Sequence, residues 1–96
     1  MTIEEQIINK TKSQGEFGTM LNYIQDVAEE VLTEKEWDSY LEKANNDTEQ
    51  CEGQDGILLN GEYFDWRQFK SQRFNIVKAY LRYFNQEQLN KILKAI

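Results

Sequence analysis

The chain has 96 residues with no histidine, no proline and one cysteine, and its formal net charge is −6 at pH 7. A chain of this length builds one hydrophobic core and has no room for a deep substrate cleft. The absence of histidine removes the commonest general base and the commonest metal ligand, and the lone Cys51 excludes an intramolecular disulfide and a multi-cysteine zinc site. We therefore expect a non-catalytic domain without a cofactor or a bound metal.

The charge is divided unevenly along the chain. Residues 1–56 contain fourteen acidic and four basic residues, a net charge of −10, whereas residues 57–96 contain three acidic and seven basic residues, a net charge of +4. Such a division can steer and orient a charged partner, and it says little about the fold. It favours a binding role.

Helix-start signals recur along the chain. Thr2 with Glu5 and Thr33 with Glu36 form T-x-x-E capping boxes, and Asp65 and Asn85 are further candidate caps. Apolar residues recur at helical spacing after each of them and also after the Gly18-Thr19 break. The predicted helices cover residues 2–15, 19–32, 33–44, 65–84 and 86–96, and the fourth is expected to be the longest.

Two segments between these helices carry other signals. Residues 45–56 contain no large apolar residue and hold two glycines, so we expect a loop there. Asn60-Gly61 lies between apolar residues, the pattern of a two-residue type I′ turn, and predicts a small β-hairpin near residues 57–64.

These elements predict an all-α fold, a compact bundle of four or five short helices with one small β-hairpin. We expect residues 1–96 to form a single domain with an acidic helical half (1–44), a polar loop (45–56) and a half that holds the hairpin and the basic, aromatic helices (57–96). No apolar run approaches the roughly 18 residues that span a bilayer, and the first residues are acidic where a secretory signal would be basic. We expect a cytoplasmic protein that does not enter a membrane.

The acidic helices supply the first candidate binding surface. Carboxylates at intervals of three or four residues can present a row of negative charge that resembles a phosphate backbone. The same pattern is typical of a solvated helix face that only confers solubility. The residues expected to contact a partner are Glu29, Glu30, Glu34, Glu36, Asp38 and Glu42.

A second candidate surface combines aromatic and basic residues. Aromatic side chains that stay outside the core would act as rigid anchors at a protein interface, and those that fill the core would not. The candidates are Trp37, Tyr40, Arg67, Lys70 and Arg73. The basic helix of residues 65–84 followed by residues 86–96 also allows a helix-turn-helix interpretation, although the sequence pI of about 4.6 disfavours direct nucleic-acid binding.

A calcium site has little support. Asp55, Gly56, Leu58 and Glu62 match an EF-hand loop that starts at Cys51, but the positions of the first ligands hold residues without carboxylates. The favoured hypothesis is a small acidic protein that binds and blocks a protein with a basic nucleic-acid-binding surface, in the manner of phage-encoded inhibitors, DNA mimics or immunity proteins. A DNA-binding transcriptional regulator is the alternative, and a homodimer is an open possibility for either.

Overall fold

The computed structural model describes residues 1–14, 17–49 and 55–96. Within these ranges the chain forms five α-helices, two 3-10 helices and one two-stranded antiparallel hairpin, which confirms the predicted all-α class with a small hairpin. The α-helices are α1 (Ile3–Thr11), α2 (Phe17–Val31), α3 (Glu34–Glu49), α4 (Arg73–Leu81) and α5 (Gln86–Ala95). The other elements are β1 (Gly56–Leu59), β2 (Glu62–Asp65) and the 3-10 helices η1 (Lys12–Gln14) and η2 (Trp66–Gln68).

Side-chain caps fix the start of three α-helices. Each cap accepts a hydrogen bond from a backbone N–H three residues further on, which satisfies one of the donors that a helix leaves unpaired at its N-terminus. The capping residues are Thr2, Thr33 and Asn85. The helices α1, α3 and α5 therefore begin where the sequence predicts, whereas α2 begins at Phe17, two residues before the expected start.

The predicted loop over residues 45–56 was wrong in its first part, because α3 continues to Glu49. No glycine or proline interrupts residues 45–49, so nothing in this segment stops the helix. Two of its side chains, those of Asp47 and Thr48, also form hydrogen bonds. Asp47 bonds to residues of the hairpin and the α4–α5 connection, and the Thr48 hydroxyl donates to the carbonyl of Asn45. Residues 50–54 of the predicted loop lie outside the described residues.

The predicted helix over residues 65–84 was also wrong, because it is divided into η2, a turn and the nine-residue α4. Asp65 accepts a hydrogen bond from the backbone N–H of Arg67 and caps the start of η2. The ring centroids of Trp66 and Phe69 lie 4.5 Å apart. Phe69 and Phe74 are five residues apart, a spacing that does not keep both on one face of a helix. Among the described helices α3, with 16 residues, is the longest.

The hairpin forms as the sequence predicts. Asn60 and Gly61 occupy the two turn positions with φ values of 47° and 85°, the left-handed conformation that a type I′ turn requires. Leu59 pairs with Glu62 next to the turn, and Gly56 pairs with Asp65 at the other end.

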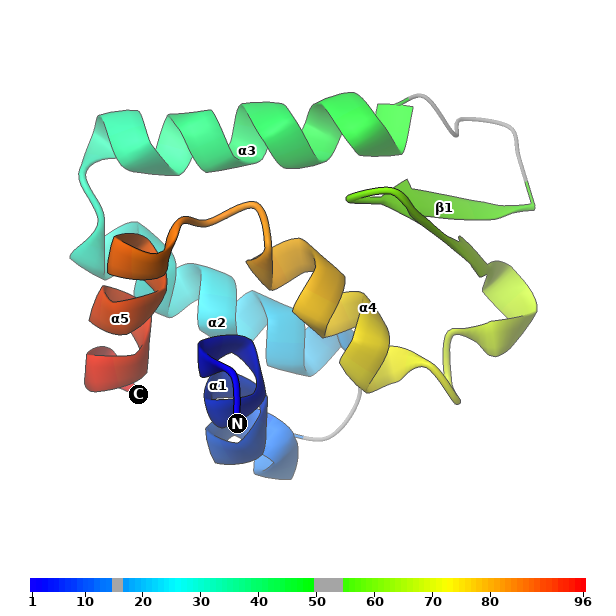
Figure 1. Ribbon diagram of the computed structural model, residues 1–96, viewed down its shortest axis with the longest axis horizontal. Helices are drawn as coiled ribbons and strands as arrows, with labels where there is room; N and C mark the ends of the chain where they lie inside the picture. Colours follow the sequence, from blue (N-terminus) through cyan, green and yellow to red (C-terminus); the bar gives the residue numbers. More distant parts are fainter. Residues whose placement is uncertain (15–16, 50–54) are drawn as a thin grey trace.

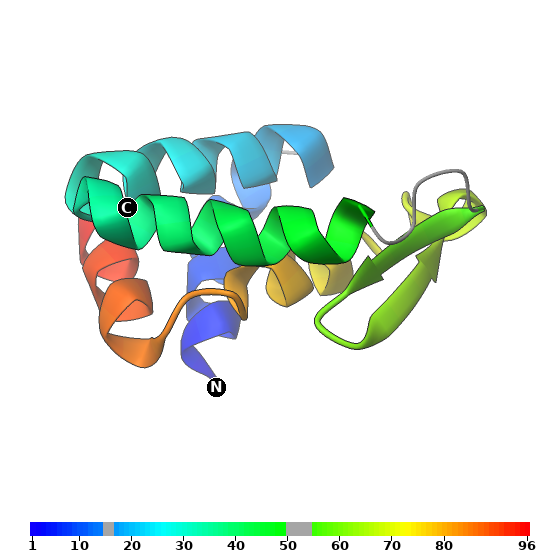
Figure 2. The ribbon, with the colours of Figure 1, turned by 90° about the horizontal axis from the view of Figure 1, so that it is seen from above.

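The helices surround one core, to which all five α-helices and both strands contribute buried side chains. The helices α2 and α3 run antiparallel along one side, and the hairpin and α5 lie at opposite ends of the molecule (Figure 1, Figure 2). Inside the core, Tyr40 of α3 stacks on Phe84 with ring centroids 3.8 Å apart, and on the partly buried Trp37 at 5.3 Å. This stack joins α3 to the connection between α4 and α5.

Two ion pairs join the acidic half of the chain to the basic half. Lys78 Nζ of α4 lies 3.6 Å from Glu5 Oε1 of α1, and Lys91 Nζ of α5 lies 3.7 Å from Glu36 Oε1 of α3. Exposed ion pairs of this kind stabilise a protein by only about 0–1 kcal/mol each, so they orient the helices more than they stabilise them.

Candidate interaction surfaces

The outward side of α3 carries three carboxylates at intervals of one helical turn. Glu34, Asp38 and Glu42 are four residues apart, and all three side chains are exposed. None of the three carboxylates accepts a hydrogen bond from, or forms an ion pair with, a residue that the structure describes. We call these three residues the acidic row. Shallow surface around it is lined by five residues of α3, including all three of the row, and by Thr33.

Two further candidates, Glu29 and Glu30, lie near the C-terminal end of α2 and are exposed. Only a short connection separates the end of α2 at Val31 from the start of α3 at Glu34, so these carboxylates lie close along the chain to the first member of the acidic row. Five of the six predicted acidic residues are therefore exposed on consecutive helices.

The sixth, Glu36, has a different environment. Its carboxylate accepts a hydrogen bond from the backbone N–H of Thr33 at 3.0 Å and one from Gln88 Nε2 at 3.3 Å, and it pairs with Lys91 of α5. The Thr33 backbone bond and the Gln88 side-chain bond hold the pKa of Glu36 below its ordinary value. This carboxylate therefore joins the start of α3 to α5.

The aromatic candidates lie mostly in the core. Tyr40 is only 2% exposed, and its hydroxyl accepts a hydrogen bond from Gln25 Nε2 at 3.0 Å. Burial raises the pKa of Tyr40 to about 12. Trp37 is half-buried and packs against the core. Tyr40 is therefore unable to reach a partner, and Trp37 offers only part of its ring.

The basic candidates do not form one helical surface. Arg67 and Lys70 are exposed and precede α4, and Arg73 is half-buried at its start. The Arg67 guanidinium lies 3.0 Å from Asp65, whose hydrogen bond and charge raise the pKa of Arg67. The Arg73 guanidinium covers the Phe74 ring at 4.6 Å and donates to the carbonyl of Lys70.

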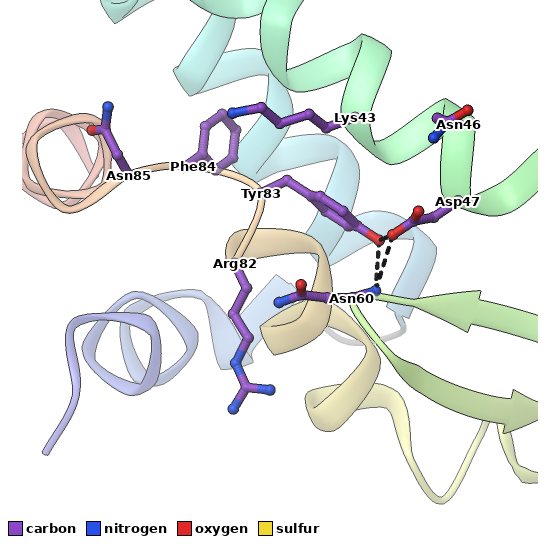
Figure 3. A pocket seen from close by; sticks show the side chains of 8 residues that line it. All are labelled: Lys43, Asn46, Asp47, Asn60, Arg82, Tyr83, Phe84 and Asn85. Carbon is purple, nitrogen blue, oxygen red and sulfur yellow. Dashed lines mark hydrogen bonds between the residues drawn. The ribbon is translucent and has the colours of Figure 1, made fainter.

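The hollow drawn in Figure 3 lies where α3, the hairpin turn and the α4–α5 connection meet. It has a volume of about 490 Å³. The Tyr83 hydroxyl donates to Asp47 Oδ2 at 2.5 Å, and the backbone N–H of Asn60 donates to the Tyr83 oxygen at 2.6 Å. Burial, together with the bond to Asp47, raises the pKa of Tyr83.

This hydrogen-bonded group holds the hairpin turn against α3. Asp47 and Tyr83 point toward each other and are bonded through Asp47 Oδ2, and Arg82 points away from them (Figure 3). The Arg82 guanidinium is instead paired with Glu62 at 2.9 Å. Nothing local in the sequence predicts this role of Tyr83, because the tyrosine lies 36 positions from its carboxylate partner.

No protein-family model matches this chain, and comparison with curated protein sequences and with solved structures also gives no match. In the parts of the chain that the structure describes, no helix is long and apolar enough to cross a membrane. The same ranges contain no group of three or more histidine, cysteine or acidic side chains arranged to hold a metal ion.

Proposed function

We propose that this protein is a non-catalytic binder that blocks or modulates another protein through its acidic helices. The proposed partner is a cytoplasmic nucleic-acid-handling protein, whose basic groove would accept these carboxylates in place of phosphates. An inhibitor from a phage or mobile element and an immunity protein against a basic nuclease both fit this description. The observation that carries the proposal is the acidic row, because Glu34, Asp38 and Glu42 are exposed and without a partner among the described residues.

The spacing of the acidic row supports mimicry of a nucleic-acid strand. Residues four apart on a helix are separated by about 6 Å along its axis. Every second phosphate of a DNA strand is separated by roughly 6.8 Å along the duplex axis. A basic surface that contacts alternate phosphates of a strand can therefore contact successive carboxylates of the acidic row on α3.

The acidic row is also held rigidly. The opposite side of α3 is anchored in the core through Tyr40 and Ala44, which are 2% and 5% exposed. The start of the helix is capped by Thr33, and Glu36 joins it to α5. Binding of a partner to α3 therefore costs little conformational entropy, because the backbone that presents these charges is already ordered, and this favours affinity.

Direct DNA binding has less support. Arg67 and Lys70 lie outside α4, so the expected long basic helix is absent from the described residues. Several of the bases are held within the molecule, as the pairs of Lys78 with Glu5 and Arg82 with Glu62 show. Fewer positive charges then remain to contact phosphates.

The test is affinity capture from nuclease-treated bacterial lysate with three forms of the tagged protein. These are the wild type, the triple variant Glu34→Lys/Asp38→Lys/Glu42→Lys and the single variant Glu87→Lys, which reverses an exposed charge on α5. Bound proteins are identified by mass spectrometry at low salt and at about 0.5 M salt, where exposed charges are screened.

We expect the wild type and Glu87→Lys to capture the same nucleic-acid-binding protein, and added duplex DNA to compete for it. The triple variant should lose this protein while its circular dichroism spectrum stays helical. Capture that survives the triple reversal, or that DNA does not compete, contradicts the proposal. A capture that Glu87→Lys loses equally would mean that net charge, and not the acidic row, determines binding.

A further inference from the structure

An open hollow lies on the surface between α1 and α4, two helices that contact each other. Its volume is about 370 Å³, within the range of roughly 300–1,000 Å³ that is typical of small-molecule sites. Its apolar lining consists of Ile8, which is buried, and Phe74, which is half-buried and packs against the core. The other lining residues are polar or charged, namely Glu5, Asn9, Lys12, Asn75 and Lys78. We call this feature the α1–α4 hollow.

Positive charge gathers around the Phe74 ring. Lys12 Nζ lies 5.5 Å from the ring centroid, and the guanidinium carbon of Arg73 lies 4.6 Å from it. Both distances are within the roughly 6 Å over which a cation is attracted to an aromatic face. Neither cation forms an ion pair with a carboxylate of the described residues. The ring therefore holds two basic side chains at the hollow, and no described acidic residue is paired with either of them.

A third cation, Lys78, lines the hollow from α4. Its side chain is only 27% exposed, and its Nζ lies 3.6 Å from Glu5 Oε1. The Glu5 carboxylate also accepts a hydrogen bond from the Thr2 hydroxyl at 3.2 Å. The bond from Thr2 and the charge of Lys78 hold the pKa of Glu5 below its ordinary value, so Glu5 is ionised at neutral pH. Together with Lys12 and Arg73 the site holds three bases and one acid, a net charge of +2, on a chain whose net charge is −6.

Two asparagines add hydrogen-bond donors, one from each helix. Asn9 Nδ2 of α1 donates to Met1 Sδ at 3.0 Å, and Asn75 Nδ2 of α4 donates to Gln72 Oε1 at 2.6 Å. A carboxamide nitrogen carries two N–H groups, so each asparagine keeps a second donor that no described residue accepts. Both asparagines are exposed, so these donors are accessible to a ligand in the hollow.

This combination of charge and donors matches the chemistry of a phosphate group. A phosphate monoester carries a charge of about −1.5 to −2 at pH 7 and three strong acceptor oxygens, which the local charge of +2 and the amide donors complement. A carboxylate has one charge and two acceptor oxygens, and it matches the site less well. A nucleic-acid duplex extends beyond the hollow, so its other phosphates would meet the acidic surface of the chain. The ligand that fits best is therefore a small molecule.

We propose that the α1–α4 hollow binds the phosphate group of a small molecule, either inorganic phosphate or a phosphate monoester. The ammonium groups of Lys12 and Lys78 contact the phosphate oxygens, and Arg73 adds positive charge nearby. Asn9 and Asn75 donate to the same oxygens or to hydroxyls beside them. The helix α1 lies across the molecule from α3 and its acidic row (Figure 1), so this proposal does not depend on the proposed function.

The test is an NMR titration of the full chain with sodium phosphate at neutral pH, with sodium chloride keeping the ionic strength constant. Because the hollow is open and salt screens its charges, we expect saturation with a dissociation constant of roughly 1 mM. The amide shifts should concentrate in residues 5–12 and 73–78. Ribose alone should cause no such shifts. Ribose 5-phosphate should bind more tightly than inorganic phosphate if the hollow takes a monoester, and equally if it takes the free anion.

Three variants separate the hollow from general charge effects. Lys12→Gln removes one cation and should weaken phosphate binding about tenfold, the factor for one hydrogen bond between charged groups. Asn75→Asp places a negative charge in the hollow and should abolish binding. It lies in the first turn of α4, where a carboxylate favours the helix, so this variant is expected to fold. Lys35→Gln makes the same charge change as Lys12→Gln on α3 and should bind like the wild type.

Absence of saturable shifts up to about 20 mM phosphate, well above the expected dissociation constant, overturns the proposal. So do shifts that lie on another surface, or binding that Lys12→Gln and Asn75→Asp leave intact. Equal weakening by Lys12→Gln and Lys35→Gln would also contradict it, because net charge, and not the α1–α4 hollow, would then govern binding.

Discussion

At the scale of single residues, Asp47 and Glu36 show that acidic side chains close together in the sequence can have different environments in the fold. In the sequence both belong to the same run of carboxylates as Asp38 and Glu42. In the structure Asp47 accepts a hydrogen bond from the Tyr83 hydroxyl, and the bonds of Glu36 join α3 to α5. Asp38 and Glu42, in contrast, are exposed. Partner binding is therefore expected to depend on the exposed carboxylates and stability on the two that are bonded.

Removing the Tyr83 hydroxyl should destabilise the protein. Tyr83→Phe leaves the ring in place but removes one of the two donors to Asp47 Oδ2, the other being the Asn60 N–H, and deprives that N–H of its shorter hydrogen bond. We expect the free energy of unfolding to fall by about 1.5–3 kcal/mol, the range for a hydrogen bond to a charged group. Urea denaturation followed by circular dichroism measures it.

Tyr23→Phe is the matched control, because Tyr23 is an exposed tyrosine on α2. Its unfolding free energy should stay within about 0.5 kcal/mol of the wild type. Equal effects of the two substitutions would show that the bond between Tyr83 and Asp47 contributes nothing measurable.

At the scale of elements, α3 combines a stabilising cap with unfavourable charge spacing. The cap from Thr33 and the bonds of Glu36 hold its first turn, and Tyr40 anchors its middle. Along its exposed side, however, the carboxylates of the acidic row repel their neighbours one turn away. Such repulsion costs stability and is understandable where the charges serve recognition.

Asp38→Lys should therefore stabilise the fold while it weakens partner binding. The substitution replaces two repulsive contacts, with Glu34 and Glu42, by attractive ones, and the new proximity to Lys35 offsets part of the gain. We expect a gain of about 0.3–0.5 kcal/mol, equivalent to a rise of roughly 2 °C in melting temperature. A melting temperature below that of the wild type would contradict the repulsion inferred here.

The bonds of Glu36 should give α3 a stabilisation that depends on pH. Its pKa in the folded protein is lowered from an ordinary value of 4.5, so the stabilisation is complete above that value and is lost as the pH falls through the lower folded pKa. The melting temperatures of wild type and Glu36→Gln should therefore differ at pH 6 and converge toward pH 3.

Glu34→Gln is the control for that comparison, since Glu34 lies on the same turn and has no bond to a described residue. Its melting temperature should follow that of the wild type more closely at every pH. A difference between wild type and Glu36→Gln that grows in acid would mean that the sign of the linkage is wrong.

At the scale of the whole molecule, the chain combines strong charge with a lack of groups that titrate near neutrality. Its 17 acidic and 11 basic residues include no histidine. Carboxylates ordinarily titrate below about pH 5 and lysines above about pH 9. The charge pattern that would steer a partner is therefore constant over the physiological range.

We accordingly expect the unfolding midpoint in urea to be constant between about pH 6 and 7.5, with a decline only in more acidic solution. A slope within that window would contradict this expectation, because it would show that an ionisable group titrates there. Adding salt should weaken capture of the proposed partner at each of these pH values to the same extent.

The sequence by itself determined the features that depend on neighbouring residues. Capping residues fixed the starts of α1, α3 and α5, because the bond that each one makes spans only three positions. The Asn60-Gly61 turn fixed the hairpin, because few residues adopt positive φ at low cost. That Glu34, Asp38 and Glu42 share one side of a helix was also predictable from their four-residue interval, whereas the bonds that distinguish Glu36 from them were not.

Only the tertiary structure decided the features that depend on distant residues. The end of α3 at Glu49 accompanies a hydrogen bond from Tyr83 to Asp47, and the burial of Tyr40 depends on Phe84 and Gln25. The division of residues 65–84 into η2, a turn and α4 is likewise apparent only in the folded chain. Contacts between residues tens of positions apart leave no local periodicity, so only the folded chain shows which charges and rings remain available to a partner.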